Sequence, residues 1–356
     1  AASDVYKRQE LYLYFYDWKD TMMNVNQILK SNPVIRCFGK KVKIYNEFCH
    51  DAQNFAKYYV ESAEKSGDYR YSIMLLVHSL EKGMCMPNPR PFGFDKVRDL
   101  MRLLGNYSEK SCFEYEVGVS VLNAWKVFFE EHNWQSEKYY KEVVAFLSTK
   151  KFVYETGYKK YLPVIELENE EDFEKIIFSR HSVRDYKDEP IKNKDLKLAL
   201  KAFVETPTAC NRQMCRVIGV KDTKIKTELN KVIIGLPGFN KEHVNFFIIT
   251  YDLAAFAYSG ERQQGLLNTG LCTMNFVNAL HAKGIGSCCL QWSNKHSEDR
   301  RIRKLLGLKD SERIGVIVGA GYYLPENTIP CSVRRPISDI YREVSVSYTH
   351  LTLPTN

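Results

Sequence analysis

Near residue 165 the hydrophobic pattern of this sequence changes its period, and this change limits the possible folds more than any other feature. From about residue 12 to residue 161, apolar residues recur at the spacing of amphipathic helices, and no strand pattern interrupts them. After the change, helical segments alternate with short apolar runs rich in β-branched residues, which are typical of buried strands. We therefore expect an all-α domain over 10–165 and a domain containing a sheet over 166–345.

The second domain has a definite order of expected elements. Helices are expected at 170–180, 194–204, 262–282 and 297–305, and strands at 216–221, 244–250, 285–291 and 314–320. Such alternation is by itself typical of a doubly wound α/β sheet. The dinucleotide fingerprint of those folds is incomplete, however, because Gly284 and Gly286 lack a third glycine and follow a helix rather than a strand.

Composition narrows the classes of partner and cofactor. The 51 lysines and arginines exceed the 43 acidic residues to give a net charge of +8, and the two signs are interleaved, so no nucleic-acid partner is expected. The ten cysteines form no CxxC pair, so no metal site is expected, and scattered thiols in apolar runs indicate a cytoplasmic location. No apolar run reaches the roughly 18 residues of a spanning helix, so no membrane partner is expected.

The two ends of the sequence have a different character from the rest. Residues 1–9, AASDVYKRQ, and residues 346–356, VSYTHLTLPTN, resemble translated sequencing-adapter read-through and share no periodicity with the adjoining segments. We exclude both from the interpretation of the fold.

A basic segment, FSRHSVRDY at residues 178–186, follows an expected helix whose apolar residues Phe173, Ile176 and Ile177 share one face. Guanidinium and hydroxyl groups at a helix end suit a phosphate or another anion, because charge-assisted bonds from arginine are strong and can be bidentate. A solvated basic helix end has the same appearance, so this segment alone leaves both interpretations open.

A second polar segment, ETPTACNRQMCRVIGV at residues 205–220, runs directly into an apolar strand. Together, RHSVR and PTACNRQ resemble the flavin-binding signatures of the FMN-dependent nitroreductase family, in order and in spacing. The resemblance extends from about Glu166 to Glu343. In place of the doubly wound alternative, it implies an α+β fold with a mixed central sheet flanked by helices, preceded here by the all-α domain. It also implies a two-fold homodimer.

The resemblance also implies roles for the residues of these two motifs. The first motif would bind FMN, with Arg180 at the phosphate, Ser182 at a ribityl or phosphate oxygen, and His181 in the same site. Arg184 would lie near the pyrimidine edge, where a cation stabilises negative charge on the ring and raises its reduction potential, a catalytic role of electronic tuning. The second motif would contact the flavin across the dimer interface through Thr208, Asn211 and Gln213. This chain has Met214 and Cys215 where the family commonly has proline and an aromatic residue, which alters the expected packing on the ring.

Two further segments match the family pattern. CCLQWSN would place backbone groups near flavin N5 at Leu290, Gln291 and Trp292. Its Cys288 and Cys289 are expected in the strand core, because the alternative, a vicinal redox pair, is strained. CSVRRP would place Arg334 and Arg335 at the phosphate, although adjacent arginines near a terminus are often only solvated.

The function implied is that of a bacterial FMN-dependent oxidoreductase, which uses NAD(P)H in a ping-pong cycle to reduce a small electron-poor acceptor. One alternative is a specialised flavin reaction, such as dehydrogenation of a bound intermediate or reductive dehalogenation. Another is a flavin-binding protein without catalysis, in which the helical domain docks a partner.

In the helical domain, the segment HSLEKG offers His78, Glu81 and Lys82 on one helix face. Without a nucleophile or a metal-ligand spacing beside them, we interpret these residues as structural. The proline-rich loop at residues 84–94 is long enough to reach a neighbouring element, and we expect it to cover the flavin. The competing interpretation is that this domain docks a partner and leaves the flavin exposed.

Overall fold

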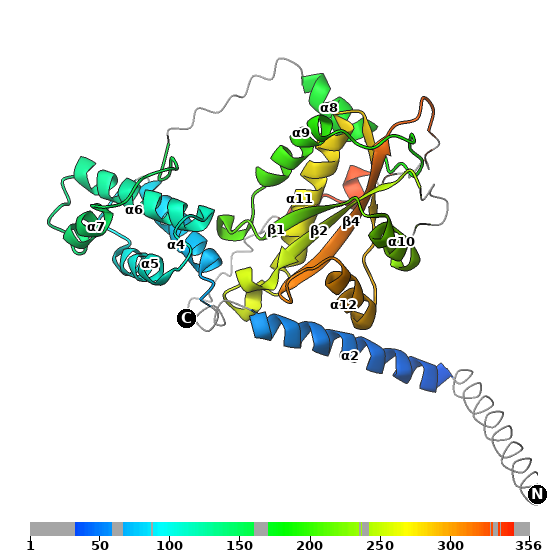
Figure 1. Ribbon diagram of the computed structural model, residues 1–356, viewed down its shortest axis with the longest axis horizontal. Helices are drawn as coiled ribbons and strands as arrows, with labels where there is room; N and C mark the ends of the chain where they lie inside the picture. The colour runs from blue at the N-terminus through cyan, green and yellow to red at the C-terminus, as the bar shows by residue number, and fades with distance from the viewer. Residues whose placement is uncertain are drawn as a thin grey trace, which may run out of the picture.

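The computed structural model describes residues 33–58, 67–86, 88–159, 170–234, 242–327 and 336–344, together with residues 236, 329 and 334. Figure 1 shows a group of helices beside a helix-flanked sheet, as expected. In the described part of the chain, no strand precedes Cys215, so the predicted α+β class with an N-terminal helical region is confirmed. The predicted domain boundary near residue 165 and both terminal segments lie outside the described residues.

The helical region consists of α4 (Arg70–Met84), α5 (Phe94–Asn106), α6 (Phe113–Glu131) and α7 (Tyr140–Leu147). Its core forms around α6, where Leu122 and Trp125 are fully buried against apolar residues of α4 and α5. In α4, Glu81 accepts a hydrogen bond from the Gly157 N–H at 3.4 Å and binds the segment after α7. This contact matches the structural interpretation of HSLEKG.

The proline-rich loop packs one of its phenylalanines, Phe92, into the helical region. The Phe92 ring lies directly over Gly83, where an added Cβ would be 2.0 Å from a ring carbon, and packs against Phe128 and Phe129. Trp125 Nε1 donates to the Phe92 carbonyl at 3.2 Å. Phe92 therefore belongs to the helical core, and coverage of the flavin by the rest of this loop stays a prediction.

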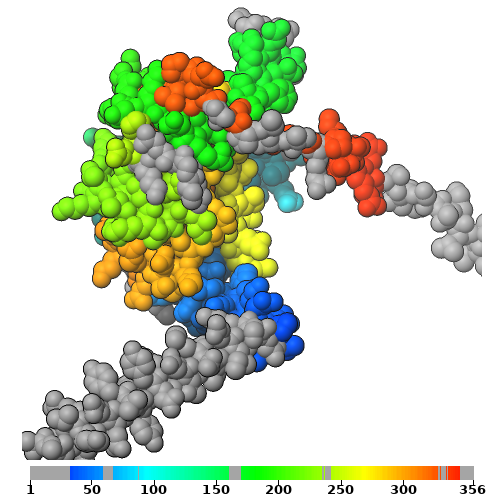
Figure 2. Space-filling model, turned by 90° about the vertical axis from the view of Figure 1, so that its right-hand side faces the viewer, coloured from blue at the N-terminus to red at the C-terminus, as the bar shows by residue number. Residues whose placement is uncertain are grey.

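An isolated helix, α2 (Pro33–Tyr58), lies along the C-terminal region rather than in the helical region (Figure 1). The His50 ring stacks on His296 with centroids 4.3 Å apart, and the Phe55 ring lies 5.8 Å from Phe256. Figure 2 shows this helix in blue against the orange residues of α12 (His296–Leu305). None of the helices in the described segments combines the length and apolarity that crossing a bilayer requires.

The sheet contains β1 (Cys215–Val220), β2 (Asn245–Asp252), β3 (Ile285–Leu290) and β4 (Glu312–Tyr322) in the order β1-β2-β4-β3. All pairs between these strands are antiparallel. The parallel component of the sheet is one bridge from Ser182 to Ser287, by which the segment after α8 (Glu170–Ser179) joins the β3 edge.

Helices cover both faces of the sheet because its strands alternate their apolar residues between two cores. Phe247 and Ile249 of β2 pack with α9 (Asn193–Val204) and α11 (Gln264–His281). Phe246 and Ile248 face α10 (Thr223–Val232) and α12. Sequence patterns did not predict α10. In the structure, Asp222 caps the start of this helix by accepting from the N–H groups of Lys224 and Ile225 at 2.8 and 2.9 Å.

The segment after α8 crosses the sheet where glycines leave room for it. Tyr186 is buried over Gly321 and donates from its hydroxyl to the carbonyls of Val183 at 2.6 Å and Gly319 at 3.0 Å. A Cβ on Gly321 would lie 2.5 Å from the Tyr186 Cβ, and one on Gly286 would lie 3.3 Å from the Val183 Cβ. These two glycines thus permit the basic motif to lie on the sheet.

We expect the substitution Gly321→Ala to lower the free energy of unfolding by about 1–3 kcal/mol, because Tyr186 must move out of a close-packed position. Urea denaturation monitored by circular dichroism measures the effect. Gly219→Ala is the matched control, because the Cβ at that strand glycine would meet Phe247 at an ordinary 3.7 Å. Equal stability of the two variants would contradict the assigned role of Gly321.

Candidate functional site

The first part of the candidate site is the arginine segment, residues 180–184, which leaves the end of α8 and runs beside β3. The Val183 N–H donates to the Ser287 carbonyl at 3.0 Å, which fixes Ser182 at the sheet edge. Arg180, His181 and Ser182 are half-buried, and Arg184 is exposed with Nη1 3.4 Å from the Ser182 carbonyl. The segment thus carries two guanidinium groups and a hydroxyl on one edge of the sheet.

A chain of hydrogen bonds fixes the end of α8 immediately before Arg180. Ser179 Oγ donates to the Lys175 carbonyl and lies 2.7 Å from His281 Nε2, while His281 Nδ1 lies 2.7 Å from the Tyr323 hydroxyl. Since the serine proton is already donated, Nε2 carries the histidine proton and Nδ1 accepts from Tyr323. Burial, followed by the charges of Arg180 and His181, lowers the pKa of His281 and favours this neutral form.

The positive charges of Arg180 and Arg184 act on a buried thiol of β3. Burial raises the pKa of the Cys288 thiol, while the charges of Arg184 and Arg180 oppose the rise. Cys288 is buried as predicted, but Cys289 is exposed, so its predicted place in the core is wrong. The reason is that β3 is an edge strand whose Cys289 side is covered at Ile285 and Ser287 but open at Cys289 itself.

The segment after β3 has a mixed character. Leu290 is buried, Gln291 is exposed, and Trp292 is half-buried with Nε1 donating to Asp299 of α12 at 2.8 Å. The side chain of Trp292 is therefore committed to the fold. Arg334 is exposed, and Arg335 lies outside the described residues.

The second part of the candidate site is the polar turn, residues 208–213, which precedes β1 and contains the helical turn η2 (Ala209–Asn211). Cys210, Asn211 and Gln213 have φ angles of 52°, 49° and 51°, in the left-handed region that ordinary residues avoid. Such conformations persist where the surroundings stabilise them, and they cluster at ligand sites. Asn211 and Gln213 are exposed, so their amide groups face outward.

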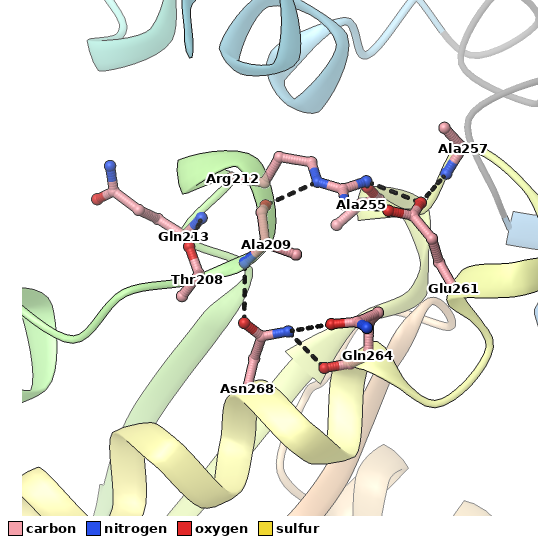
Figure 3. A network of polar contacts seen from close by, with 9 residues as sticks. All are labelled: Thr208, Ala209, Arg212, Gln213, Ala255, Ala257, Glu261, Gln264 and Asn268. Carbon is pink, nitrogen blue, oxygen red and sulfur yellow. Dashed lines mark hydrogen bonds and ion pairs between the residues drawn. The ribbon is translucent and has the colours of Figure 1, made fainter. Parts of the chain in front are cut away.

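The inner side of the polar turn is stabilised by a buried polar network (Figure 3). Arg212 forms an ion pair with Glu261 through both terminal nitrogens and donates from Nε to the Ala209 carbonyl at 3.0 Å. The Ala209 N–H donates to Asn268 Oδ1 at 2.9 Å, and Thr208 Oγ1 accepts from the Gln213 N–H at 3.0 Å. Gln213 points away from this network, which leaves its side chain for an external partner (Figure 3).

The ion pair decides the charge state of Glu261. Its burial alone would raise the pKa, but hydrogen bonds from Arg212 and from the Ala257 N–H outweigh burial and lower the pKa of the carboxyl group. The side chains of Arg212 and Glu261 are 1% and 10% exposed. The network therefore contains a buried pair of opposite charges.

Within one subunit the two parts of the candidate site lie far apart. The arginine segment joins β3 and the polar turn leads into β1, which are opposite edges of the sheet. Helix α11 connects them, with Asn268 contacting the polar turn and His281 contacting the end of α8. These contacts are about 20 Å apart, since each helical residue advances by about 1.5 Å. One small cofactor head group cannot bind both parts of the same subunit.

An apolar surface lies on the helices between the two parts. Leu266, Leu267, Leu271 and Met274 of α11 are 56%, 56%, 45% and 46% exposed, and Val204 of the adjoining α9 is 65% exposed. A contiguous exposed apolar surface of this kind is typical of a protein interface.

Sequence reasoning missed the residues that stabilise both parts. Arg212 lies inside the motif PTACNRQ, but its partner Glu261 is 49 residues away. The need for a buried partner becomes evident only once Arg212 is known to be buried. Ser179, His281 and Tyr323 come from three distant segments with no common spacing. No group of His, Cys, Asp or Glu side chains in the described segments is arranged to hold a metal.

Comparison with known proteins supports the motif assignment. A family model described as "Nitroreductase family" matches residues 177–245 and 240–322. The chain is 26% identical over 149 residues to "Putative NADH dehydrogenase/NAD(P)H nitroreductase" of Archaeoglobus fulgidus, an alignment that covers 42% of this chain and 83% of the relative.

The comparison with solved structures aligns nitroreductases with somewhat under half of this chain. A nitroreductase family protein from Streptococcus pneumoniae is 21% identical, with a TM-score of 0.41 over 48% of this chain and 100% of the other. An FMN-dependent nitroreductase from Clostridium difficile is 21% identical, with a TM-score of 0.38 over 44% of this chain and 91% of the other.

Proposed function

Because residues 177–322 of this chain form a nitroreductase-family domain of an oxidoreductase, we propose that the protein binds FMN and transfers hydride from NAD(P)H to a small electron-poor acceptor. The observation that carries the proposal is the pair of signatures, the arginine segment and the polar turn, in the matched region. The name of the archaeal relative refers to NAD(P)H, which supports a reduced nicotinamide as the hydride donor.

The donor groups of the two parts fit FMN. When bound, FMN supplies the hydride chemistry, so the chain has to bind and orient it. Arg180, with His181 and Ser182 beside it, would bind the phosphate, and the exposed Arg184 would stabilise negative charge at the ring. Thr208, Asn211 and Gln213 would bind the ring through hydroxyl and amide groups. Backbone groups near Leu290, Gln291 and Trp292, and Arg334 with Arg335, would complete the site.

We further propose that this site forms in a homodimer. In one chain the two parts lie at opposite edges of the sheet, whereas the arginine segment of one copy and the polar turn of another can meet across a two-fold axis. The exposed leucines and Met274 of α11 lie between them and would be buried in such a dimer.

The proposal is tested by adding FMN to the purified protein and following flavin absorbance after gel filtration. We expect bound FMN at one per subunit, bleaching on addition of NADH or NADPH, and recovery when a nitroarene or quinone is added. A protein that elutes without FMN would refute the flavin assignment. Bound FMN that neither nicotinamide bleaches would instead indicate a flavin-binding protein without this activity.

A further inference from the structure

The helical region and the C-terminal region meet at the first turn of α4. Tyr71 is 5% exposed, yet it packs with Met214, Phe247, Leu253 and Phe256 of the C-terminal core rather than with the helical core. The remaining buried residues of α4, such as Ile73 and Leu80, pack with α5 and α6. Helix α4 also lies against η2 of the polar turn. One tyrosine therefore joins the helical region to the part of the protein that contains the proposed flavin contacts.

The Tyr71 hydroxyl binds a buried carboxylate that is itself joined to the polar turn. It donates to Asp252 Oδ2 at 3.1 Å, and Asp252 is 1% exposed. The other carboxylate oxygen accepts from the Ala254 N–H at 3.0 Å, and the Asp252 N–H donates to the Met214 carbonyl at 3.2 Å. Burial, followed by the charge of Asp252, raises the pKa of Tyr71, so its hydroxyl remains a donor. Tyr71 is thus two hydrogen bonds from Met214, the residue that directly follows the polar turn.

The polar turn needs such support. Left-handed backbone is unfavourable for most residues other than glycine, and Cys210, Asn211 and Gln213 all adopt it. The network around Arg212 stabilises the first half of the turn, and Thr208 bridges to Gln213. Met214, directly after the turn, is bound by Asp252, whose buried charge is stabilised by the Tyr71 hydroxyl and by Arg216 at 4.0 Å.

We propose that Tyr71 is a positioning residue through which the helical region fixes the polar turn for FMN binding. The inference rests on the proposed function, and it assigns the helical region a role at the flavin site. The region acts through α4 and Asp252, on the protein side of the turn, while Asn211 and Gln213 on the outer side contact the cofactor.

The test compares Tyr71→Phe, which removes only the hydroxyl, with two controls in the full chain. Tyr158→Phe removes another tyrosine hydroxyl of the helical region, which donates to Glu131 at 2.9 Å on the surface. Val97→Ala opens the helical core, where Val97 is fully buried, without contacting Asp252. Amide hydrogen exchange of residues 208–214 is measured without FMN, and the Kd for FMN is measured by fluorescence quenching.

We expect Tyr71→Phe to speed exchange in the polar turn and to weaken FMN binding, each by about tenfold, which is the lower end of the effect of losing one hydrogen bond to a charged group. Both controls should leave the exchange of residues 208–214 and the Kd unchanged. Unaltered exchange in Tyr71→Phe, or an equal change in Val97→Ala, would overturn the inference. If the wild-type protein binds no FMN while Tyr71→Phe still speeds exchange, the proposed function fails and the structural link from Tyr71 to the turn remains.

Discussion

Replacement of Arg212 by methionine is expected to lower the free energy of unfolding by about 3–5 kcal/mol, because it leaves the Glu261 carboxylate buried without its cation. Methionine keeps the aliphatic part of the side chain but lacks the guanidinium group, so the hydrogen bonds to the Ala209 and Ala255 carbonyls are lost together with the charge. Urea denaturation at neutral pH measures the change. Lys231→Met, which removes a cation from an exposed ion pair with Glu228, is the control and should leave stability essentially unchanged.

The pH dependence of this variant identifies the cause. In the wild-type protein the pKa of Glu261 is lowered, so the stabilising contribution of the carboxylate is present above the ordinary glutamate value of about 4.3 and disappears as the pH falls through the folded value. Without Arg212, burial dominates and raises the folded pKa, so the variant is favoured at acidic pH. The stability gap should therefore be largest near neutral pH and shrink on acidification. A gap in stability that is independent of pH would show that the loss arises from packing. If the buried charge is the cause, the double variant Arg212→Met with Glu261→Gln should recover part of the lost stability.

Local patterns predicted the elements of this fold well because their signals are short-range. The strands β2 and β4 have apolar residues on both faces and were predicted to within about two residues at each end. Helix α10 was missed because TKIKTELNKV is polar and short, and its cap at Asp222 resembles an ordinary turn in sequence. The predicted class is confirmed.

The candidate site could be predicted only as a set of segments. Sequence order places the arginine segment and the polar turn near each other, yet strand order places them at opposite edges, and no periodicity reports strand order. The left-handed backbone of Cys210 and Gln213 is likewise invisible, because neither residue favours it, and only the buried network around Arg212 and Asn268 explains it. The contact between Tyr71 and Asp252 joins residues 181 positions apart.

The proposed sharing of the site between two subunits predicts that two inactive variants restore each other. Arg180→Ala removes a guanidinium group from a phosphate and should weaken FMN binding by about 10- to 150-fold, as hydrogen bonds to charged groups are worth about 1.5–3 kcal/mol. A turn variant, Asn211→Gly with Gln213→Gly, removes both outward amides while glycine accepts the left-handed backbone of those positions. Each variant alone should purify without FMN at micromolar concentrations of the cofactor.

When the two variants are expressed together with different affinity tags, a purified mixed dimer should bind FMN at one of its two sites. In that dimer, one site receives the intact arginine segment from the turn variant and the intact polar turn from the Arg180→Ala chain, while the other site carries both defects. A site built within a single subunit cannot be restored in this way, because each chain of the mixed dimer keeps its own defect. Wild-type dimers should bind FMN at every subunit. If the mixed dimers then bind none, the two segments do not share a cofactor across the interface. A monomeric holoprotein in light scattering would show the same independently.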